Sequence, residues 1–446
     1  ILYMNSLINI TPIDGRYNNI TSRLSEYFSE YGLIRYRLIV EINYIYLLCK
    51  QLNLEINQDK LFTIIYSFNL EECEKIKQIE SKIKHDVKSV EKYIHQRFIE
   101  LEIPFKNLIH FGLTSQDINN VSITLSIKDY MTKMYKLNLI EIISKLQEIM
   151  HKSDIVMLSH THGQPAVPTT LKKEIHVFKY RLSKEYLNLN TIKHYTKFGG
   201  AVGNFNAHYC AYPNYNWVEF SNNFLEQLGL ERSQYTTQID NYENLSIFFD
   251  NIKRINTILI DMCQDIWIYI SMNYFKQKFN NDEVGSSTMP HKINPINFEN
   301  AEGNLLLSVN ILEFLSRKLP ISRLQRDLTD STILRNLGIA FGYCEIAYHN
   351  ILTGLSKLEP NRESILSDLN KNVVVLTEGI QTILRKHGDD KAYDKLKDFC
   401  RNNDKKDIFD IKNFIQNLDV EEHIKEELNN LDINNYIGYL NNKKLI

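Results

Sequence analysis

Residues 240–284 read DNYENLSIFFDNIKRINTILIDMCQDIWIYISMNYFKQKFNNDEV and contain neither glycine nor proline. Apolar side chains recur in this stretch at steps of three and four residues, the spacing that places them on one face of an α-helix. The repeating positions are Leu245, Phe248, Phe249, Ile252, Ile255, Leu259, Met262 and Ile266. Because no helix-breaking residue interrupts the pattern, it predicts one long helix.

The same spacing recurs on both sides of this stretch. Four further helices are expected, over residues 123–149, from after Pro168 to 189, over 304–318 and over 331–358. No stretch shows the sustained alternation of apolar and polar residues that is typical of a half-buried strand. Helices of more than about 25 residues usually pack against several neighbours, within one chain or between subunits. The pattern therefore predicts an all-α protein whose central bundle of long helices assembles into a multi-subunit helical core.

The length of the chain suggests about three domains, at roughly 100–200 residues each. The turn-like residues 110–115, HFGLTS, precede the first long helical pattern, and Pro360 follows the last one. The residues after this proline are charged, rich in asparagine and built of shorter amphipathic pieces. We therefore expect a helical domain over 1–110, the long-helix bundle over 111–359 and a small helical domain over 360–446.

The composition excludes several classes of protein. Of the 446 residues, 43% are hydrophobic and 24% are charged, and the net charge is −2. This balance argues against a nucleic-acid partner, which a basic surface would recognise. No apolar run reaches the roughly 18–20 residues of a membrane span, and no signal peptide is recognisable, so we expect a cytoplasmic protein. The six cysteines are scattered, without the spacing of a zinc site.

Residues 285–295, GSSTMPHKINP, contain two prolines, a glycine and two adjacent serines. They cannot continue a helix and must form a loop. Such a loop can be a mere connector. Its density of functional groups favours a site instead: the serines offer hydroxyls, Lys292 offers a positive charge for a carboxylate, and Asn294 offers an amide.

This loop resembles the signature of the superfamily of fumarase, aspartase and argininosuccinate lyase, whose members release fumarate by β-elimination. Further motifs extend the resemblance nearly end to end, and it is closest to the adenylosuccinate lyase family of bacterial type. They are Asp14-Gly15-Arg16-Tyr17, Lys84-His85-Asp86-Val87, residues 110–115, Thr161-His162-Gly163-Gln164-Pro165, Thr236-Thr237-Gln238 and Gln325-Arg326-Asp327.

The resemblance implies a C–N lyase that needs no cofactor and acts on small nucleotides. Its expected reactions release fumarate from adenylosuccinate to give AMP, and from succinylaminoimidazole carboxamide ribotide (SAICAR) to give AICAR. The family is homotetrameric. Because the motifs lie far apart along long helices, we expect each active site to draw on several subunits.

β-Elimination requires a base, an acid and a cradle for negative charge. A proton leaves the carbon beside a carboxylate while the C–N bond breaks, and the intermediate places extra negative charge on that carboxylate. The resemblance implies that Ser286 is the base. A serine of ordinary acidity is a poor base, so we expect backbone amides and Lys292 to stabilise its alkoxide once the loop closes and expels water.

His162 precedes Pro165 and is expected at the N-terminus of the third long helix. A lone histidine is more often structural than catalytic, but the resemblance implies that His162 is the general acid. It also implies that His85 supports His162 or contacts the phosphate side of the substrate. His160 suggests a metal site, but no third ligand of matching spacing appears, so no metal is expected. Glu299 is expected to orient His162, although a carboxylate in a helix's first turn also stabilises the helix.

The substrate carries a phosphate of about −1.5 to −2 and two carboxylates, so fixed cations must gather around it. Arg16, Lys292, Arg326 and Arg335 are the candidates. Ser331 and Arg335 lie four residues apart at the start of a predicted helix and could receive the phosphate together with helix N-terminal amides. The alternative for this pair is a solvated helix face.

The resemblance implies further substrate contacts. Arg16 and Tyr17 would surround the nucleotide, Asp86 would hydrogen-bond the purine or its amide equivalent, and Lys84 would join the substrate-binding residues. Thr114 and Ser115 would bind one succinyl carboxylate, Asn294 with Lys292 the other, and Gln238 would lie near the reacting centre.

Two other functions compete with this interpretation. Argininosuccinate lyase and fumarase share the signature loop, but residues for phosphate capture make sense only for a nucleotide. A structural protein recruited from this fold could lose its base or acid without penalty, yet both are present here. A nucleic-acid-binding module is disfavoured by the charge.

Overall fold

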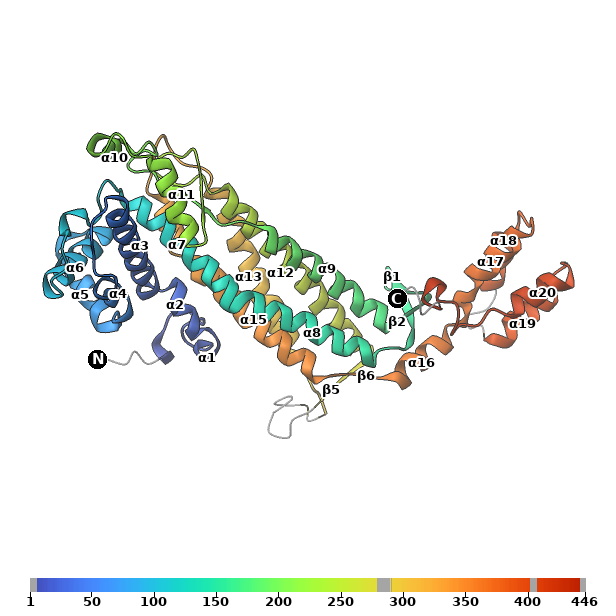
Figure 1. The fold of residues 1–446 in the computed structure, drawn as a ribbon. Helices are drawn as coiled ribbons and strands as arrows, with labels where there is room; N and C mark the ends of the chain where they lie inside the picture. The colour runs from blue at the N-terminus through green and yellow to red at the C-terminus, as the bar shows by residue number, and fades with distance from the viewer. Residues whose placement is uncertain (1–5, 279–288, 290, 402–406, 442–446) are drawn as a thin grey trace. The chain divides into compact units, whose positions relative to one another are not determined.

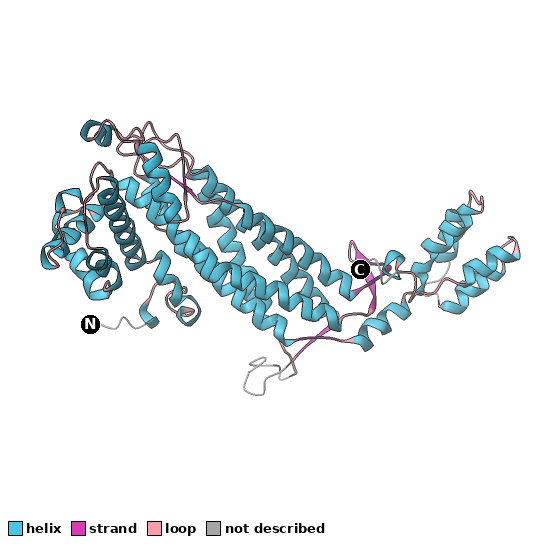
Figure 2. Cartoon of the chain, viewed as in Figure 1, coloured by secondary structure: helices cyan, strands magenta, loops and turns pink. Residues whose placement is uncertain are grey.

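The structure is a computed structural model, and it describes residues 6–278, 289, 291–401 and 407–441. Helices make up most of these residues, and the strands among them are short (Figure 1 and Figure 2). This confirms the all-α class. Within the described residues, no helix combines the length and the apolar character that crossing a membrane requires.

The N-terminal part of the chain forms a series of helices. They are α1 Asn18–Thr21, α2 Ser25–Phe28, α3 Glu30–Gln51, α4 Gln58–Tyr66, α5 Leu70–Ile83 and α6 Asp86–Glu100. Several begin at a side chain that accepts a hydrogen bond from a backbone N–H of the first turn, which has no partner within the helix. Ser29 caps α3 in this way, Asn57 caps α4, and His85 caps α6.

The long helices predicted from the sequence are present, with different ends. They are α7 Ser115–Tyr130, α8 Lys136–Lys152, α9 Leu171–Thr191, α12 Glu243–Ser271, α13 Ile296–Lys318 and α15 Leu337–Lys357. A π-helical turn over Met131–Tyr135 joins α7 to α8. The helix predicted over 240–284 ends at Ser271, because Asn273 adopts the left-handed conformation (φ 59°) that closes a helix end.

Three other predicted boundaries are wrong. The stretch 331–358 forms two helices, α14 Thr329–Leu334 and α15, with Asn336 between them. The helices expected from residues 123 and 304 begin earlier, at Ser115 and Ile296. Thr114 and Asp117 form a capping box that fixes the first of these starts.

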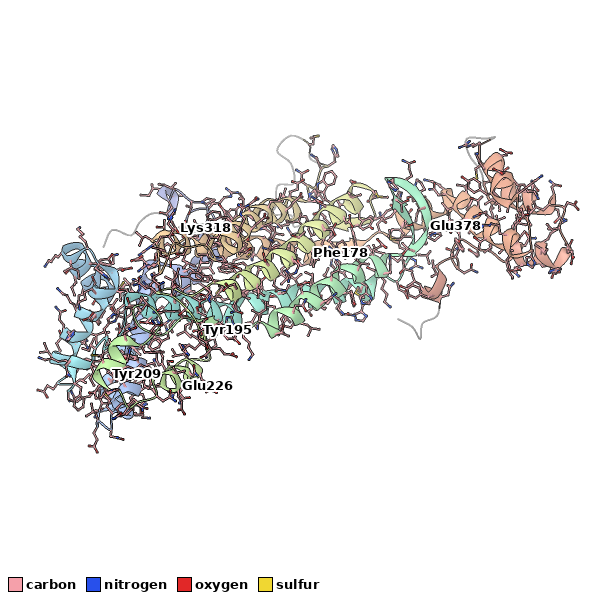
Figure 3. The ribbon with its side chains drawn as sticks, turned by 90° about the horizontal axis from the view of Figure 1, so that it is seen from above. Phe178, Tyr195, Tyr209, Glu226, Lys318 and Glu378 are labelled. Atoms are coloured by element: carbon pink, nitrogen blue, oxygen red, sulfur yellow. The ribbon has the colours of Figure 1, made fainter. Side chains whose placement is uncertain are left out.

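Buried polar side chains hold α12, α13 and α15 together. The Tyr348 hydroxyl on α15 donates to Asn256 Oδ1 on α12 at 2.6 Å, and Asn256 Nδ2 donates to Ser308 Oγ on α13 at 3.2 Å. Figure 3 shows the same helices from above, with Phe178 labelled on α9 and Lys318 at the end of α13. Since each of these buried polar groups has a partner, the network fixes how the three helices pack.

Three pairs of short strands join neighbouring segments. They are β1 Val156–Thr161 with β2 Gln164–Thr170 (antiparallel), β3 Tyr195–Thr196 with β4 Glu231–Arg232 (parallel), and β5 Phe275–Gln277 with β6 Leu358–Pro360 (antiparallel). The first pair is a hairpin whose turn, His162-Gly163, has φ values of 53° and 71°. Positive φ at both positions is the geometry of a tight two-residue hairpin. The prediction that His162 starts a helix is therefore wrong.

The chain divides into two compact units. The first comprises Ile1–Ile140, Lys184–Ile260 and Asn300–Asn350, and the second comprises Glu141–Ser183, Asp261–Glu299 and Ile351–Ile446. Both contain parts of the long helices, so this division does not test the three-domain prediction, which stays a prediction.

Each unit contains further helices. The first has α10 Asn206–Ala211 and α11 Trp217–Gln227. The second ends in α16 Arg362–Lys371, α17 Thr377–Lys386, α18 Ala392–Arg401, α19 Ile408–Gln416 and α20 Glu422–Asn429, drawn in orange and red in Figure 1. Buried aliphatic side chains of these last helices form a core with Leu158 of β1.

Candidate functional site

The predicted site residues belong to both units. The first unit carries Arg16, Tyr17, Lys84, His85, Asp86, Thr114, Ser115, Gln238, Arg326, Ser331 and Arg335. The second carries His162, Lys292, Asn294 and Glu299. The predicted base, Ser286, lies outside the described residues.

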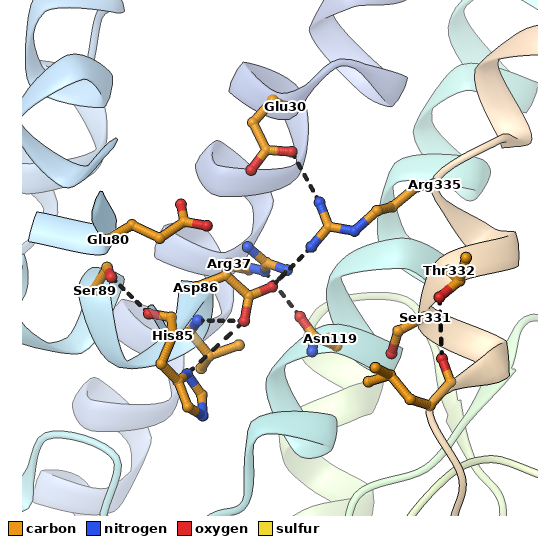
Figure 4. A network of polar contacts seen from close by, with 12 residues as sticks. Glu30, Arg37, Glu80, His85, Asp86, Ser89, Asn119, Ser331, Thr332 and Arg335 are labelled. Atoms are coloured by element: carbon orange, nitrogen blue, oxygen red, sulfur yellow. Dashed lines mark hydrogen bonds and ion pairs between the residues drawn. The ribbon is translucent and has the colours of Figure 1, made fainter. Parts of the chain in front are cut away.

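Asp86 is the centre of a cluster of charges in the first unit (Figure 4). It occupies the first position of α6, where its Oδ1 accepts from the Val87 N–H at 2.9 Å. Its Oδ2 accepts from Arg37 Nη2 at 2.6 Å and from Arg335 Nη2 at 3.1 Å. Burial raises the pKa of Asp86, but Arg37, the Val87 N–H and Arg335 outweigh burial and hold the pKa below its usual range. Asp86 is therefore an ionised acceptor.

Arg335 reaches this cluster from the segment that follows α14. Its Nη1 donates to Glu30 Oε2 at 3.0 Å, and its side chain is 46% exposed. Arg335 is the C-cap of the six-residue α14 and Ser331 lies inside that helix. The prediction that both lie at the start of one long helix is wrong: Ser331 lies in the first turn of the short helix α14, and Arg335 follows that helix.

A small cavity of about 130 Å³ opens beside these side chains. It is lined in part by Arg37, Asp86, Gln116, Asn119, Ser331 and Arg335. Asp86 was predicted from one sequence motif and Ser331 with Arg335 as a pair at helical spacing, and the fold brings the three to one place. The cavity therefore presents guanidinium, hydroxyl and amide donors to one small volume.

Three predicted substrate contacts meet next to this cavity. Arg326 Nη2 donates to Ser331 Oγ at 3.1 Å, and Arg326 Nη1 donates to Gln238 Oε1 at 3.3 Å. Gln116 Nε2 also donates to Ser331 Oγ, at 3.2 Å, and this side chain is buried. Gln116 was not predicted from the sequence, although it stands directly between Ser115 and the capping Asp117.

Thr114 and Ser115 are held at the start of α7 by Asp117. The Asp117 carboxylate accepts from the Thr114 N–H at 2.8 Å and from Lys197 Nζ at 2.6 Å. It also accepts from the Gly199 and Gly200 N–H groups, at 2.8 Å and 3.1 Å. Asp117 and Lys197 are fully buried. These contacts fix the first turn of α7 and the two residues at its start.

The preceding loop is fixed by two further contacts. His110 Nδ1 lies 2.5 Å from Oε1 of the buried Glu41. Gly112 has φ 69°, and a Cβ built there would lie 2.7 Å from the ring of His208. Only glycine fits this position, for reasons of both conformation and space.

Arg16 and Tyr17 lie at the beginning of α1. The Arg16 guanidinium lies 5.8 Å from the centre of the Tyr17 ring, within reach of a cation–π interaction. The Tyr17 hydroxyl accepts from Asn300 Nδ2 at 2.8 Å. Asn300 on α13 is therefore a further residue of this region that was not predicted from the sequence.

Lys84 and His85 connect α5 to α6. Lys84 adopts a left-handed conformation, φ 57°, as the C-cap of α5. His85 Nδ1 accepts from the Lys88 N–H at 3.2 Å, and its side chain is 52% exposed. With Nδ1 used as an acceptor, a neutral imidazole carries its proton on Nε2, where it is available to a ligand.

In the second unit, His162 is exposed at the tip of the β1–β2 hairpin. Glu299 lies in the first turn of α13, as predicted, and its Oε1 accepts from Trp267 Nε1 at 3.0 Å. Within the described residues no hydrogen bond joins Glu299 to His162. The proposed orienting role of Glu299 stays a prediction.

The described end of the signature loop approaches α13 without regular structure. The Lys292 N–H donates to the Met289 carbonyl at 3.0 Å, and Gln277 Nε2 donates to the Ile293 carbonyl at 3.2 Å. Lys292 is exposed and Asn294 is half-buried. As predicted, residues 291–295 form a loop. No group of three potential metal-binding side chains occurs in the part of the chain that the structure describes.

Two family models match the chain. The model described as "Lyase" matches residues 15–308, and the model described as "Adenylosuccinate lyase C-terminal" matches residues 322–437. Together they cover both units of the structure.

Several curated proteins are similar over nearly the whole chain. The adenylosuccinate lyase of Dictyostelium discoideum is 47% identical over 458 aligned residues, which cover 98% of each chain. The adenylosuccinate lyase of Escherichia coli K12 is 44% identical over 449 residues, covering 98% of this chain and 97% of the relative.

Solved structures share the fold at much lower sequence identity. A fumarate lyase from Mesorhizobium sp. BNC1 matches with a TM-score of 0.73 and 15% identity, covering 94% of this chain and 95% of the other. The β-carboxy-cis,cis-muconate cycloisomerase of Acinetobacter calcoaceticus sp. ADP1 matches with a TM-score of 0.71 and 15% identity, covering 96% and 97%. At this identity the likeness concerns the fold alone.

Proposed function

The chain belongs to the adenylosuccinate lyase family, and on that basis we propose how its residues share the reaction. It is a C–N lyase that eliminates fumarate from adenylosuccinate and leaves AMP. The observation that carries the proposal is that Ser331 and Arg335 line the small cavity of the first unit and that Arg326 donates to Ser331 Oγ.

The phosphate of the nucleotide binds at this cavity. A phosphate of about −1.5 to −2 charge forms strong charge-assisted hydrogen bonds with guanidinium groups. Arg335 supplies such a group at the exposed edge of the cavity. Arg326 donates to Ser331 Oγ and so places a second guanidinium next to the cavity. Arg16 and Tyr17 complete the contacts of the nucleotide together with Lys84. Asp86, an ionised acceptor, receives a hydrogen bond from the purine.

The succinyl group binds through its two carboxylates. Thr114 and Ser115 receive one of them, because Asp117 holds the first turn of α7 rigid and its amide dipoles favour an anion. Lys292 and Asn294 hold the other carboxylate. Gln238, which accepts a hydrogen bond from Arg326, lies near the bond that breaks.

Proton transfer requires one group on each side of the breaking bond. Ser286 takes the proton from the carbon beside the carboxylate, and the electron pair of that C–H bond forms the double bond of fumarate. The C–N electrons move to the nitrogen, which takes a proton from His162. Glu299 orients His162, and His85 either supports His162 or contacts the phosphate side.

The functional unit is a homotetramer with shared active sites. Several apolar side chains of the long helices are exposed in the single chain: Val177 and Leu187 on α9, Ile247 and Ile268 on α12, and Leu306, Leu307 and Phe314 on α13. Exposed apolar surface of this kind marks a site of association. His162, exposed in one chain, gains the closed surroundings that a general acid needs when another subunit covers it.

SAICAR is the second substrate. It carries the same succinyl group on a nitrogen and the same ribose phosphate, so the contacts at both ends of the site are common to the two substrates. Only the middle contact at Asp86 differs. No cofactor takes part, and the enzyme acts in the cytoplasm, where its charged nucleotide substrates occur.

The phosphate site is tested by binding of AMP and adenosine to Arg335→Met. Loss of one charge-assisted contact is expected to weaken AMP about tenfold or more and leave adenosine nearly unchanged. Arg385→Met, an exposed arginine of α17 near Gln381, is the control and should change neither. Equal weakening of AMP and adenosine by Arg335→Met would refute a phosphate site at this position.

A further inference from the structure

Arg37 is a buried charge that no sequence motif pointed to. It lies on α3, and its side chain is 2% exposed. Its Nε donates to Asn119 Oδ1 at 2.8 Å and its Nη2 to Asp86 Oδ2 at 2.6 Å (Figure 4). Its Nη1 is buried and has no hydrogen-bond partner among the described residues. Burying a guanidinium is costly unless its charge is paired, so the Asp86 contact is the reason it can stay there.

The contact between Arg37 and Asp86 keeps both groups charged. Burial lowers the pKa of Arg37, and Asp86 is the first of the groups that oppose this effect. In turn, Arg37 is the first of the groups that hold down the pKa of Asp86. The two side chains therefore form an internally neutral pair beside the cavity.

This pair matters because Asp86 also contacts Arg335, the proposed phosphate ligand. Asp86 Oδ2 lies 3.1 Å from Arg335 Nη2. Without a second cation, this carboxylate would pair with the Arg335 guanidinium and would repel an incoming dianion. Glu30, the other carboxylate on Arg335, has a second cationic contact, because its Oε1 lies 3.1 Å from Lys77 Nζ, which also lies 2.6 Å from Glu80 Oε2. Each carboxylate beside Arg335 therefore has a second cationic partner, which is Arg37 for Asp86 and Lys77 for Glu30.

We propose that Arg37 is a positioning residue for phosphate recognition: by neutralising Asp86 it leaves the charge of Arg335 to the nucleotide's phosphate. The inference rests on the proposed phosphate site. Arg37 acts through Asp86 rather than on the substrate, since its Nη1 is closed to solvent and its Nε and Nη2 already donate to Asn119 and Asp86.

The test is the ratio of the inhibition constants of AMP and adenosine in the assembled enzyme. Arg37→Gln removes the charge, and it should weaken AMP about tenfold while adenosine changes less than about twofold. Arg37→Lys keeps the charge and should retain most of the preference for AMP. A purely structural role would weaken both inhibitors together, which would overturn the proposal.

The comparison in an Asp86→Asn background separates the indirect role from a direct one. There is no carboxylate to neutralise in that background, so adding Arg37→Gln should leave the AMP-to-adenosine ratio within about twofold. A further tenfold loss would mean that Arg37 acts on the phosphate itself. The double variant has no buried carboxylate without a counter-charge at this position. It is therefore expected to fold even if Arg37→Gln alone does not, and the comparison can still be made.

Failure of this inference is distinguishable from failure of the phosphate site. If Arg335→Met leaves the AMP-to-adenosine ratio unchanged, the phosphate does not bind at this cavity. If Arg335→Met lowers the ratio and Arg37→Gln does not, the phosphate site holds and the role assigned to Arg37 is wrong.

Discussion

At the scale of single residues, the buried pair of Asp117 and Lys197 has the largest structural effect on the site. Asp117 connects the start of α7 to the backbone of Gly199 and Gly200, and Lys197 Nζ donates to Asp117 and to the Gly200 carbonyl. The loop that carries the proposed carboxylate ligands therefore depends on one neutralised carboxylate.

Lys197→Met is expected to lower the free energy of unfolding by about 3–5 kcal/mol, because it leaves Asp117 buried without its counter-charge. Chemical denaturation at matched protein concentration measures the change. Lys395→Met, which breaks an exposed pair with Asp389, is the control and should cost less than about 1 kcal/mol. Similar losses in the two variants would contradict the structural role of Asp117.

The pair of His110 and Glu41 makes stability depend on pH. Burial lowers the pKa of His110, but the charge and hydrogen bond of Glu41 outweigh it and raise the pKa above its usual value. A raised histidine pKa contributes stability that is fully present below the unfolded pKa of about 6.5 and is lost as the pH rises through the folded pKa.

The melting temperature of the native chain should therefore fall more steeply than that of His110→Asn as the pH is raised from about 6.5. Thermal melts of both proteins across this range provide the measurement. Parallel curves would show that the histidine is not charged through its contact with Glu41.

The residues of the cavity show what the sequence could predict at this scale. Arg326, Ser331 and Arg335 were predicted because they stand in motifs or at a helical spacing. Arg37 gave no such signal, because its partners Asp86 and Asn119 lie 49 and 82 positions away in the chain. Its role arises only from tertiary contact.

At the scale of elements, the β1–β2 hairpin is the feature that was not predicted from the sequence. The residues before α9 lack sustained alternation of apolar and polar side chains, and His162 was instead expected at the N-terminus of that helix. The His162-Gly163 turn was the available signal, since glycine in a two-residue loop is typical of a hairpin. His162, the proposed general acid, is therefore held by a hairpin turn and not by the N-terminus of a helix.

Gly163→Ala tests whether this turn sets the catalytic geometry. Gly163 has φ 71° and a Cβ added there would meet open space, so the cost is conformational, about 1–2 kcal/mol. We expect kcat for adenylosuccinate to fall more than KM rises, because His162 is displaced. Gly388→Ala has the same type of strain, with φ 87° and open space, and should lower stability alone. Equal kcat values in the two variants would contradict a catalytic role for the hairpin.

Helix existence was easier to predict than helix ends. No glycine or proline follows Ser271 before residue 285, yet α12 ends there, where Asn273 adopts the left-handed conformation. Likewise, no glycine or proline marks the break at Asn336 between α14 and α15. The ends of these helices depend on local backbone conformations, which the spacing of apolar residues does not predict.

At the scale of the whole molecule, the proposed site residues are distributed over two units of one chain. The phosphate and one carboxylate ligand set belong to the first, and His162, Lys292 and Asn294 belong to the second. The all-α class followed from the periodicity of the sequence. In the proposed homotetramer, the subunit that supplies each residue of a site depends on how the chains assemble, and this cannot be predicted from one sequence.

Shared sites predict that inactive variants complement one another. His162→Ala should be nearly inactive, and Arg335→Met should be weakly active when the substrate concentration is below KM. A mixture dissociated and reassembled should recover activity under that condition, since some sites then combine native residues from different subunits. Fumarate release measured before and after mixing gives the answer. No recovery, with hybrid assembly verified by mass, would show that His162 and Arg335 of one site come from the same chain.

The most direct test of the proposed reaction is the absorbance change on fumarate release, followed with adenylosuccinate and, separately, with argininosuccinate. The proposed roles predict turnover of adenylosuccinate, its loss in Ser286→Ala with AMP binding retained, and no turnover of argininosuccinate. Activity on argininosuccinate alone, or full activity without Ser286, would contradict them.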